Sequence, residues 1–308
     1  MALLSFPKKR NAVGEPSAHG LGDILQGCSI EVMPRTAAKV EDFKGLLPEG
    51  TRVYVAHIEG TPIEEMVGTA KRLTDDGLTV MPHFPARIIK DATMLENWIK
   101  MYQSEAGVNQ ALLLAGGVDK PHGDFHSSMQ LMDTGLFDKY GFKRLHVAGH
   151  PEGNKDIDAA GSTKFVDEAM MWKQSFSEQT DAKMAIATQF AFDAKPIITW
   201  AESLRETGVT MPVHLGIAGP AKLQTLIKFA FACGVGPSIK VLQKRAADVT
   251  KLLLPYEPTE VLSDMATYCT ENSGHNIEQI HFFPLGGIKK NAEWIKEYGA
   301  NEDVANPA

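Results

Sequence analysis

Long apolar runs alternate with amphipathic segments along most of the chain. Runs such as TRVYVAHI at 51–58 and QALLLAGG at 110–117 show no regular exchange of apolar and polar positions. A strand that is buried on both faces has this pattern, which a parallel sheet covered by helices requires. The same reasoning predicts further strands at 28–34, 77–84, 142–151, 183–193, 211–217 and 277–287.

Segments with helical character lie between these runs. They predict helices over 36–47, 62–75, 91–104, 126–139, 163–179, 196–208 and 288–298, with several more between 221 and 271. Eight strands that alternate with helices, with extra helices before the last strand, predict an α/β fold of the (β/α)8 TIM barrel type. A doubly wound open sheet is the alternative, but no GxGxxG sequence follows the first strand.

The two ends of the chain lack this periodicity. Residues 1–26 contain Gly, Pro and Ser without a repeating pattern and predict an extended N-terminal arm. We expect one catalytic barrel domain over 27–300 and a short C-terminal tail over 301–308.

Composition excludes several classes of protein. A net charge of −7 and a pI near 5.8 argue against a nucleic-acid or anionic-membrane partner, because such surfaces have a basic excess. Cys28, Cys233 and Cys269 lie far apart without CxxC spacing, so neither a disulfide framework nor a thiolate zinc site is indicated. No apolar segment approaches the ~20 residues that span a bilayer, and the N-terminal apolar run is too short for a signal peptide. These features favour a cytoplasmic protein.

In a barrel, the carboxyl ends of all eight strands meet at one mouth, where ligands bind. Several histidines face that mouth in the predicted fold, but without HxH or HxxxH spacing hydrogen bonding is favoured over a metal site. The groups expected there are Glu31, His57, His83, Gly116, Gly117, His150, Gln189, His214 and His281.

Glu31 and Gln189 are the most informative of these. Glu31 lies between Ile30 and Val32, and a carboxylate buried there costs several kcal/mol, so we expect it to be protonated or partnered. A protonated carboxyl could act as a general acid; a structural salt bridge is the alternative. Gln189 follows an apolar strand, and its amide has the donor and acceptor needed to bind the edge of a heterocycle; capping of the next loop is the alternative.

Five segments resemble the methylenetetrahydrofolate reductase family. SIEVMPR at 29–35 is similar to the family's S-F-E-F-F-P-P-R, and ATQFAFD at 187–193 is similar to T-Q-F-F-F-D. MPHF, VAGHPEG and IHFFPL also resemble A-P-H-L, A-G-Y-P-x-G and H-F-Y-T-L, so the likeness covers roughly 28–290 in order. It implies a barrel that binds a tetrahydrofolate derivative and transfers hydride from NADH or NADPH, usually through FAD.

The resemblance also implies roles for single residues. Glu31 matches the family's general acid, which opens the methylene bridge of the folate. Gln189 matches an amide that contacts the pterin, and Phe229 matches an aromatic residue near the folate and the nicotinamide. His83 and Gly116 match positions that contact the flavin.

Several family positions differ in this chain. The family's L-R-G-D reads LAGG at 114–117, so Ala115 replaces an arginine and Gly117 an aspartate at the substrate. His150 replaces a tyrosine at the flavin, and Asn154 begins a segment that replaces H-P-E. The helix that supplies basic residues to the FAD diphosphate offers Lys173 without an Arg-Lys pair. A diphosphate prefers cations or a helix N-terminus, so we expect weak FAD binding or direct hydride transfer from nicotinamide to folate.

Two other functions fit the same fold. A pterin-binding methyltransferase would use the same glutamine and acid but would need a second site for the methyl acceptor. A non-catalytic folate-binding relative would tolerate the lost aspartate, whereas the retained Glu31 favours an enzyme. The direction of the reaction, the choice between NADH and NADPH, and assembly into a homo-oligomer stay open at this stage.

Overall fold

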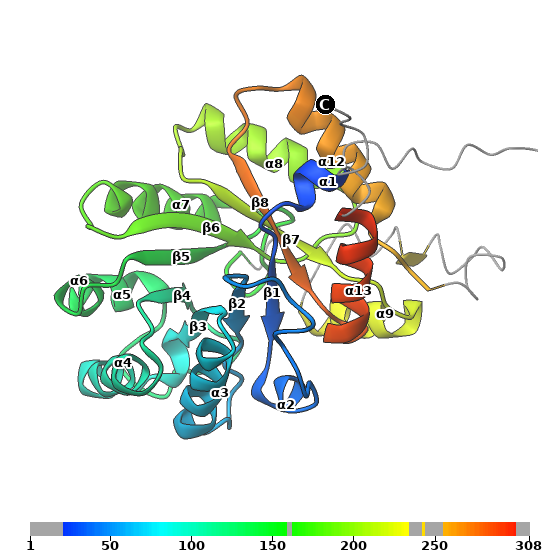
Figure 1. Cartoon of the computed structure of the whole chain (residues 1–308). Coiled ribbons are helices and arrows are strands. Elements are labelled where there is room, and N and C mark those ends of the chain that lie inside the picture. Colours follow the sequence, from blue (N-terminus) through cyan, green and yellow to red (C-terminus); the bar gives the residue numbers. More distant parts are fainter. Residues whose placement is uncertain (1–20, 159–161, 234–241, 244–254, 300–308) are drawn as a thin grey trace, which may run out of the picture.

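The computed structural model describes residues 21–158, 162–233, 242–243 and 255–299. Eight parallel strands form one closed barrel in chain order, in which β8 pairs with β1 (Figure 1). This confirms the predicted (β/α)8 TIM barrel. The strands are β1 Ser29–Val32, β2 Arg52–Val55, β3 Thr79–Pro85, β4 Gln110–Leu114, β5 Arg144–Gly149, β6 Lys183–Thr188, β7 Val213–Ala218 and β8 Ile277–Phe283.

Helices surround the barrel and bury their apolar faces against it (Figure 1). They are α1 Leu21–Leu25, α2 Pro34–Ala37, α3 Ile63–Asp75, α4 Ala92–Ala106, α5 Ser128–Asp133, α6 Leu136–Lys139, α7 Lys164–Ser177, α8 Ala194–Glu206, α9 Leu223–Ala232, α12 Thr259–Glu271 and α13 Ile288–Gly299, with a 3-10 turn at Ala86–Ile88. No helix among the described residues is long and apolar enough to cross a membrane.

Three predicted segments differ from the structure. The helix expected over 126–139 is broken into α5 and α6 at Gly135, whose φ of 65° lies in the left-handed region that glycine tolerates. The helix expected over 36–47 is limited to α2, which begins at Pro34, a residue predicted to end the first strand. The expected extended arm instead contains α1, which packs against α12, α13 and β8.

Other predicted segments lie partly outside the described residues. Of the helices expected between 221 and 271, α9 and α12 are described. Residues 1–20 of the expected arm and the whole expected tail lie outside the described residues.

Alternation along the strands decides what fills the barrel. Side chains of a strand point to opposite faces in turn, so Ile30 and Val32 pack outward in the core beneath the helices while Ser29 and Glu31 face inward. Barrel interiors are usually filled by Val, Ile and Leu. This interior instead contains three histidines that are at most 1% exposed: His146, His214 and His281.

Two glycines allow a test of this packing. A Cβ at Gly216 would meet the backbone carbonyl oxygen of Thr188 and lie 2.8 Å from that of Gln189, whereas one at Gly68 on α3 would meet nothing within 4 Å. We expect Gly216→Ala to lower the free energy of unfolding by ~1–3 kcal/mol. The exposed helical change Gly68→Ala should raise it by about 0.5–1 kcal/mol. Urea unfolding measures both, and a stable Gly216→Ala variant would contradict the close contact of β6 and β7.

Candidate active site

The carboxylate of Glu31 lies at the mouth of the barrel between two imidazoles. Its Oε2 atom is 3.3 Å from Nε2 of His83 and 3.8 Å from Nε2 of His281. The side chain of Glu31 is 20% exposed, whereas His281 is 1% exposed. Strands β1, β3 and β8 thus bring together three polar groups that the sequence analysis placed at the mouth, with Glu31 still accessible from outside.

The pKa of Glu31 does not favour a protonated carboxyl. Burial alone would raise it, but the His281 and His83 imidazoles beside the carboxylate outweigh burial and lower the pKa to about 2. The expectation of a protonated Glu31 is therefore wrong for the protein without ligand, and the expectation of a partnered one is confirmed. At neutral pH this group accepts hydrogen bonds and carries a negative charge.

His281 is held from its other side. Its Nδ1 atom is hydrogen-bonded to the hydroxyl of Ser29 at 3.0 Å, which fixes the ring so that Nε2 faces Glu31. Burial lowers the pKa of His281 and outweighs the opposing contact with Glu31. The carboxylate and this imidazole therefore hold no spare proton near neutral pH.

Gln189 follows β6 at the same end of the barrel and is half-buried. Its Oε1 atom accepts a hydrogen bond from the backbone N–H of Phe190 at 3.2 Å, as in the capping alternative. The hydroxyl of Thr188 donates to the backbone oxygen of Gln189 and accepts from the N–H of Gly216, which ties this residue to β7. No described residue accepts a hydrogen bond from the amide nitrogen of Gln189, so it can donate to a ligand.

Aromatic side chains line one side of the mouth. Phe190 packs against Phe192 at 5.6 Å and against Phe283 of β8 at 5.2 Å between ring centroids. Phe229 on α9 is partly buried against the same cluster. Asp193, the last residue of the ATQFAFD segment, caps α8 by accepting from the N–H of Lys195. The segment thus combines a polar amide, an apolar wall and a helix start.

The β4 loop approaches β3 closely. Gly116 has a φ of 92°, and a Cβ on it would lie 3.0 Å from that of Pro85. The backbone oxygen of Ala115 accepts from the N–H of Arg87 at 2.9 Å. The Arg87 guanidinium donates to the backbone oxygens of Val118 and His126, so this cation holds the loop. Gly117 lines a surface hollow of about 560 Å³ together with Glu59, Val118, Asp119, Lys120, Pro121 and His122.

Residues expected near a flavin beyond β5 do not meet Glu31. Lys173 is buried and donates from Nζ to the backbone oxygen of Ala148 at 3.2 Å, and burial lowers its pKa to about 8. Burial, with a smaller contribution from the Lys173 charge, lowers the pKa of His150 to about 4. Asn154 accepts from the N–H of Asp156 and forms a turn. The ammonium group of Lys173 is therefore bound to β5 and is not accessible to a diphosphate.

Two histidines predicted at the mouth lie elsewhere. His57 bonds to the backbone oxygen of Thr61 and stacks on Trp98 beneath α4. His214 faces Glu278, with Nε2 2.8 Å from Oε2, toward the amino-terminal end of the barrel, because a bulge between Val213 and His214 shifts the register there. Among the described residues no group of three or more His, Cys, Asp or Glu side chains could hold a metal ion.

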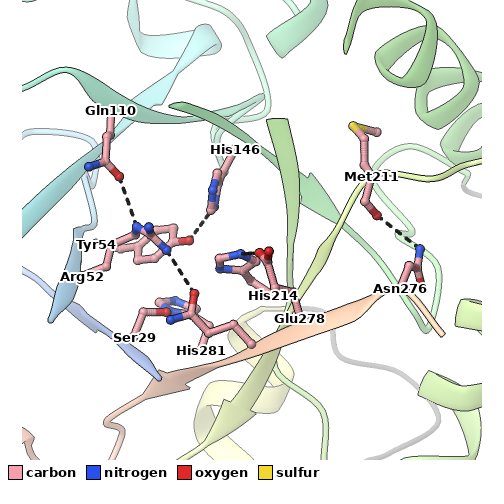
Figure 2. Close-up of polar contacts among 11 residues, drawn as sticks. Ser29, Arg52, Tyr54, Gln110, His146, Met211, His214, Asn276, Glu278 and His281 are labelled. Atoms are coloured by element: carbon pink, nitrogen blue, oxygen red, sulfur yellow. Dashed lines mark hydrogen bonds and ion pairs between the residues drawn. The ribbon is translucent and has the colours of Figure 1, made fainter. Parts of the chain in front are cut away.

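The sequence analysis missed a polar network below the mouth. The hydroxyl of Tyr54 is 2.6 Å from Nδ1 of His146, and Arg52 donates to the side chains of Gln110 and Gln279 (Figure 2). Strand geometry offered a signal, because alternate residues of a strand point to the same face. In β2 and β5 the inward positions are occupied by Arg52 and Tyr54 and by Arg144 and His146.

Comparison with known proteins supports the observed fold. No protein-family model matches the chain. An uncharacterized protein from Clostridium thermocellum that binds two copies of 5-methyl-5,6,7,8-tetrahydrofolic acid is similar over 91% of this chain and 98% of its own, with a TM-score of 0.53 and 9% identity. The 7,8-dihydropteroate synthase from Vibrio fischeri ES114 covers 91% and 94%, with a TM-score of 0.43 and 10% identity. The first similarity supports the barrel fold.

The pairing of the Glu31 carboxylate with two imidazoles predicts how the stability of the protein changes at acid pH. Its pKa is lowered from 4.5 to about 2, so its stabilising contribution is present above pH 4.5 and is lost as pH falls toward 2. Between pH 5.5 and 3, the free energy of unfolding of the wild type should fall by about 2 kcal/mol more than that of Glu31→Gln. Chemical denaturation at several pH values measures the difference.

Glu293→Gln is the matched control. Glu293 is 62% exposed and lies 3.9 Å from Lys289. The free energy of unfolding of Glu293→Gln should therefore differ from that of the wild type by a constant amount between pH 5.5 and 3. If Glu31→Gln behaves like Glu293→Gln, the two imidazoles do not hold the Glu31 carboxylate in its ionised form.

Proposed function

We propose that this protein binds a reduced folate at the barrel mouth, with the pterin between Glu31 and Gln189. The observation that carries the proposal is the partly accessible Glu31 carboxylate, held by His83 and His281 at the carboxyl end of the strands. Parallel barrels bind ligands at this end. The family resemblance of the strand motifs supports the proposal, as does the barrel of similar fold from Clostridium thermocellum that binds 5-methyl-5,6,7,8-tetrahydrofolic acid.

The chemistry of a pterin fits these groups. Its amino group and ring N–H are donors that a carboxylate accepts, and its ring nitrogens and carbonyl are acceptors for an amide N–H. Phe229 and Phe283, which are partly buried against Phe190 and Phe192, offer apolar surface to a planar ring. A pocket with an apolar wall and a few convergent polar groups is typical of small-molecule sites.

On this folate we propose hydride transfer between a nicotinamide and the methylene carbon of 5,10-methylenetetrahydrofolate. The methylene carbon bridges two nitrogens of the folate. In the reducing direction, hydride adds to this carbon, its bond to one of the two nitrogens breaks, and that nitrogen takes one proton. NADH or NADPH supplies the hydride. Glu31 passes the proton on after taking one from a neighbour, since its carboxyl group is ionised before ligand binds.

The same observations support a second function, folate binding without turnover. Glu31 and His281 hold no spare proton near neutral pH, which suits a site that binds and releases folate unchanged. A pterin-dependent methyltransferase has less support, because no metal-ligating cluster occurs among the described residues to activate a methyl acceptor.

We also propose that hydride passes to folate without tightly bound FAD. Ala115 and Gly117 carry no charge, Arg87 holds backbone oxygens of the loop after β4, and Lys173 is buried against β5. Charge-assisted contacts are typically worth ~1.5–3 kcal/mol each, so the loss of two weakens binding by roughly two to four orders of magnitude.

Gln189→Ala should weaken the binding of 5-methyltetrahydrofolate about 5- to 150-fold. The variant leaves a buried partner on the pterin unpaired, at a cost of ~1–3 kcal/mol. Isothermal titration calorimetry measures the effect, with Gln179→Ala, at an exposed position just after α7, as the control. Equal affinity in the Gln189→Ala variant and the wild type would show that the pterin is not bound there.

Turnover separates the reductase from the binding protein. Protein purified without added FAD should oxidise NADH or NADPH in the presence of 5,10-methylenetetrahydrofolate, and added FAD should not raise the rate. Loss of the proton transfer in Glu31→Gln should lower turnover ~10²–10⁴-fold. Binding of folate with no oxidation of either nicotinamide would establish the non-catalytic function, and a yellow protein with a flavin spectrum would contradict the FAD-poor proposal.

A further inference from the structure

We propose that the barrel interior contains a proton relay that connects Glu31 at the mouth with a solvent-filled hollow at the opposite, amino-terminal end. The relay consists of six further side chains from five strands: His281, Ser29, Tyr54, His146, His214 and Glu278. The use we assign to it, proton supply to the reaction, rests on the proposed function, whereas the relay itself rests on geometry alone.

The upper half of the relay joins Glu31 to Tyr54. Nε2 of His281 is 3.8 Å from Oε2 of Glu31, and its Nδ1 is 3.0 Å from the hydroxyl of Ser29. The Tyr54 ring packs against the His281 ring, with centroids 4.2 Å apart, and lies near the hydroxyl of Ser29. His281 thus contacts Glu31 through one ring nitrogen and Ser29 through the other.

The lower half joins Tyr54 to Glu278. The Tyr54 hydroxyl lies 2.6 Å from Nδ1 of His146, and Nε2 of His214 lies 2.8 Å from Oε2 of Glu278 (Figure 2). Between these pairs the rings of His146 and His214 are in edge contact, with centroids 4.5 Å apart and planes at 77°.

The two histidines in the middle each have one unpaired nitrogen. Nε2 of His146 and Nδ1 of His214 are buried without a hydrogen-bond partner in the described structure, and these atoms belong to the two rings in contact. A buried polar atom without a partner costs free energy, so two such atoms in neighbouring rings call for one explanation. A proton exchanged between the rings, directly or through one water molecule, satisfies both atoms and connects the two halves of the relay.

The lower end of the relay is open to solvent. Glu278 is 53% exposed, whereas His214 beside it is 1% exposed. Glu278 lines a hollow of about 500 Å³ together with Arg205, Val209, Thr210, Pro212, Gly274, His275 and Asn276, which lie before or at the starts of β7 and β8. Protons can therefore enter at the end of the barrel that no folate would occupy.

Charges around the relay keep its imidazoles neutral. His146 faces Arg52 of β2, Arg144 of β5 and the other two relay histidines, and burial together with these groups lowers its pKa well below its usual value. Burial also lowers the pKa of His214, to about 4, although Glu278 opposes this. His83 and Arg52 act on His281 in the same direction as burial, while Glu31 opposes them. A neutral imidazole has one donor and one acceptor, as a relay requires.

One proton crosses in balanced steps. Glu278 takes a proton from water and gives it to Nε2 of His214, which releases one from Nδ1 to Nε2 of His146. His146 then releases one from Nδ1 to the hydroxyl oxygen of Tyr54, which passes its own proton to Ser29. Ser29 passes one to Nδ1 of His281, and Nε2 of His281 delivers one to Glu31. No electrons move: the solvent loses one proton, Glu31 gains one, and each group between them ends with as many protons as it began.

Exchange of the buried imidazole protons tests the relay without any turnover. In protein labelled with ¹⁵N-histidine, NMR saturation transfer from water measures how fast the ring N–H of His146 exchanges. We expect Glu278→Gln to slow this exchange about tenfold or more, because the amide does not shuttle protons, and Glu293→Gln on exposed α13 to leave it unchanged. Equal exchange in wild type and Glu278→Gln would overturn the relay, and the backbone spectrum reports whether each variant is folded.

Tyr54→Phe then tests whether protons reach the mouth. It removes one hydroxyl in mid-relay, and its control is Tyr102→Phe, which removes a buried hydroxyl on α4 outside the barrel. With 5-methyltetrahydrofolate bound, exchange at His281 should fall about tenfold in Tyr54→Phe only, while exchange at His214 is retained. Unchanged exchange at His281 would overturn the relay. If the folate does not bind, the proposed function fails, while the exchange at His146 in the free protein still decides for or against the relay.

Discussion

The structure depends on the need to satisfy polar side chains inside a closed parallel barrel. Closure forces every second residue of each strand inward, and in this chain many of those residues are polar. A buried polar group without a partner costs ~1–3 kcal/mol, so histidines, hydroxyls and carboxylates pair across strands. The pairing of Glu31 with His83 and His281 is the upper end of this network, and the pairing of His214 with Glu278 is the lower end.

The fold could be read from the sequence because it depends on local patterns. Apolar runs such as TRVYVAHI mark strands buried on both faces, and their number and spacing match the closed barrel that the structure has. Glu31 was expected to be protonated or partnered, and its position beside two imidazoles confirms the second of these. The break between α5 and α6 was missed because one glycine within a helical pattern does not by itself end a helix.

The remaining site features depend on register and distance, which sequence patterns do not give. His57 and His83 were both predicted at the carboxyl ends of strands, yet His57 stacks on Trp98 of α4, while His214 lies beside a bulge at the start of β7. The expectation of a protonated Glu31 was wrong because the direction of its pKa shift depends on whether imidazoles lie within about 4 Å of the carboxylate. These imidazoles come from β3 and β8. Whether Gln189 contacts a pterin, and whether Ala115, Asn154 and His150 lie near a flavin, remain predictions.

The most direct test of the proposed function is a crystal structure of the protein with 5-methyltetrahydrofolate. The account predicts a pterin at the carboxyl end of the barrel, with its N–H edge on Glu31, an acceptor on the amide nitrogen of Gln189, and one face toward the phenylalanines that follow β6 and end β8. A folate bound elsewhere on the molecule, or an empty mouth at millimolar folate, would contradict it.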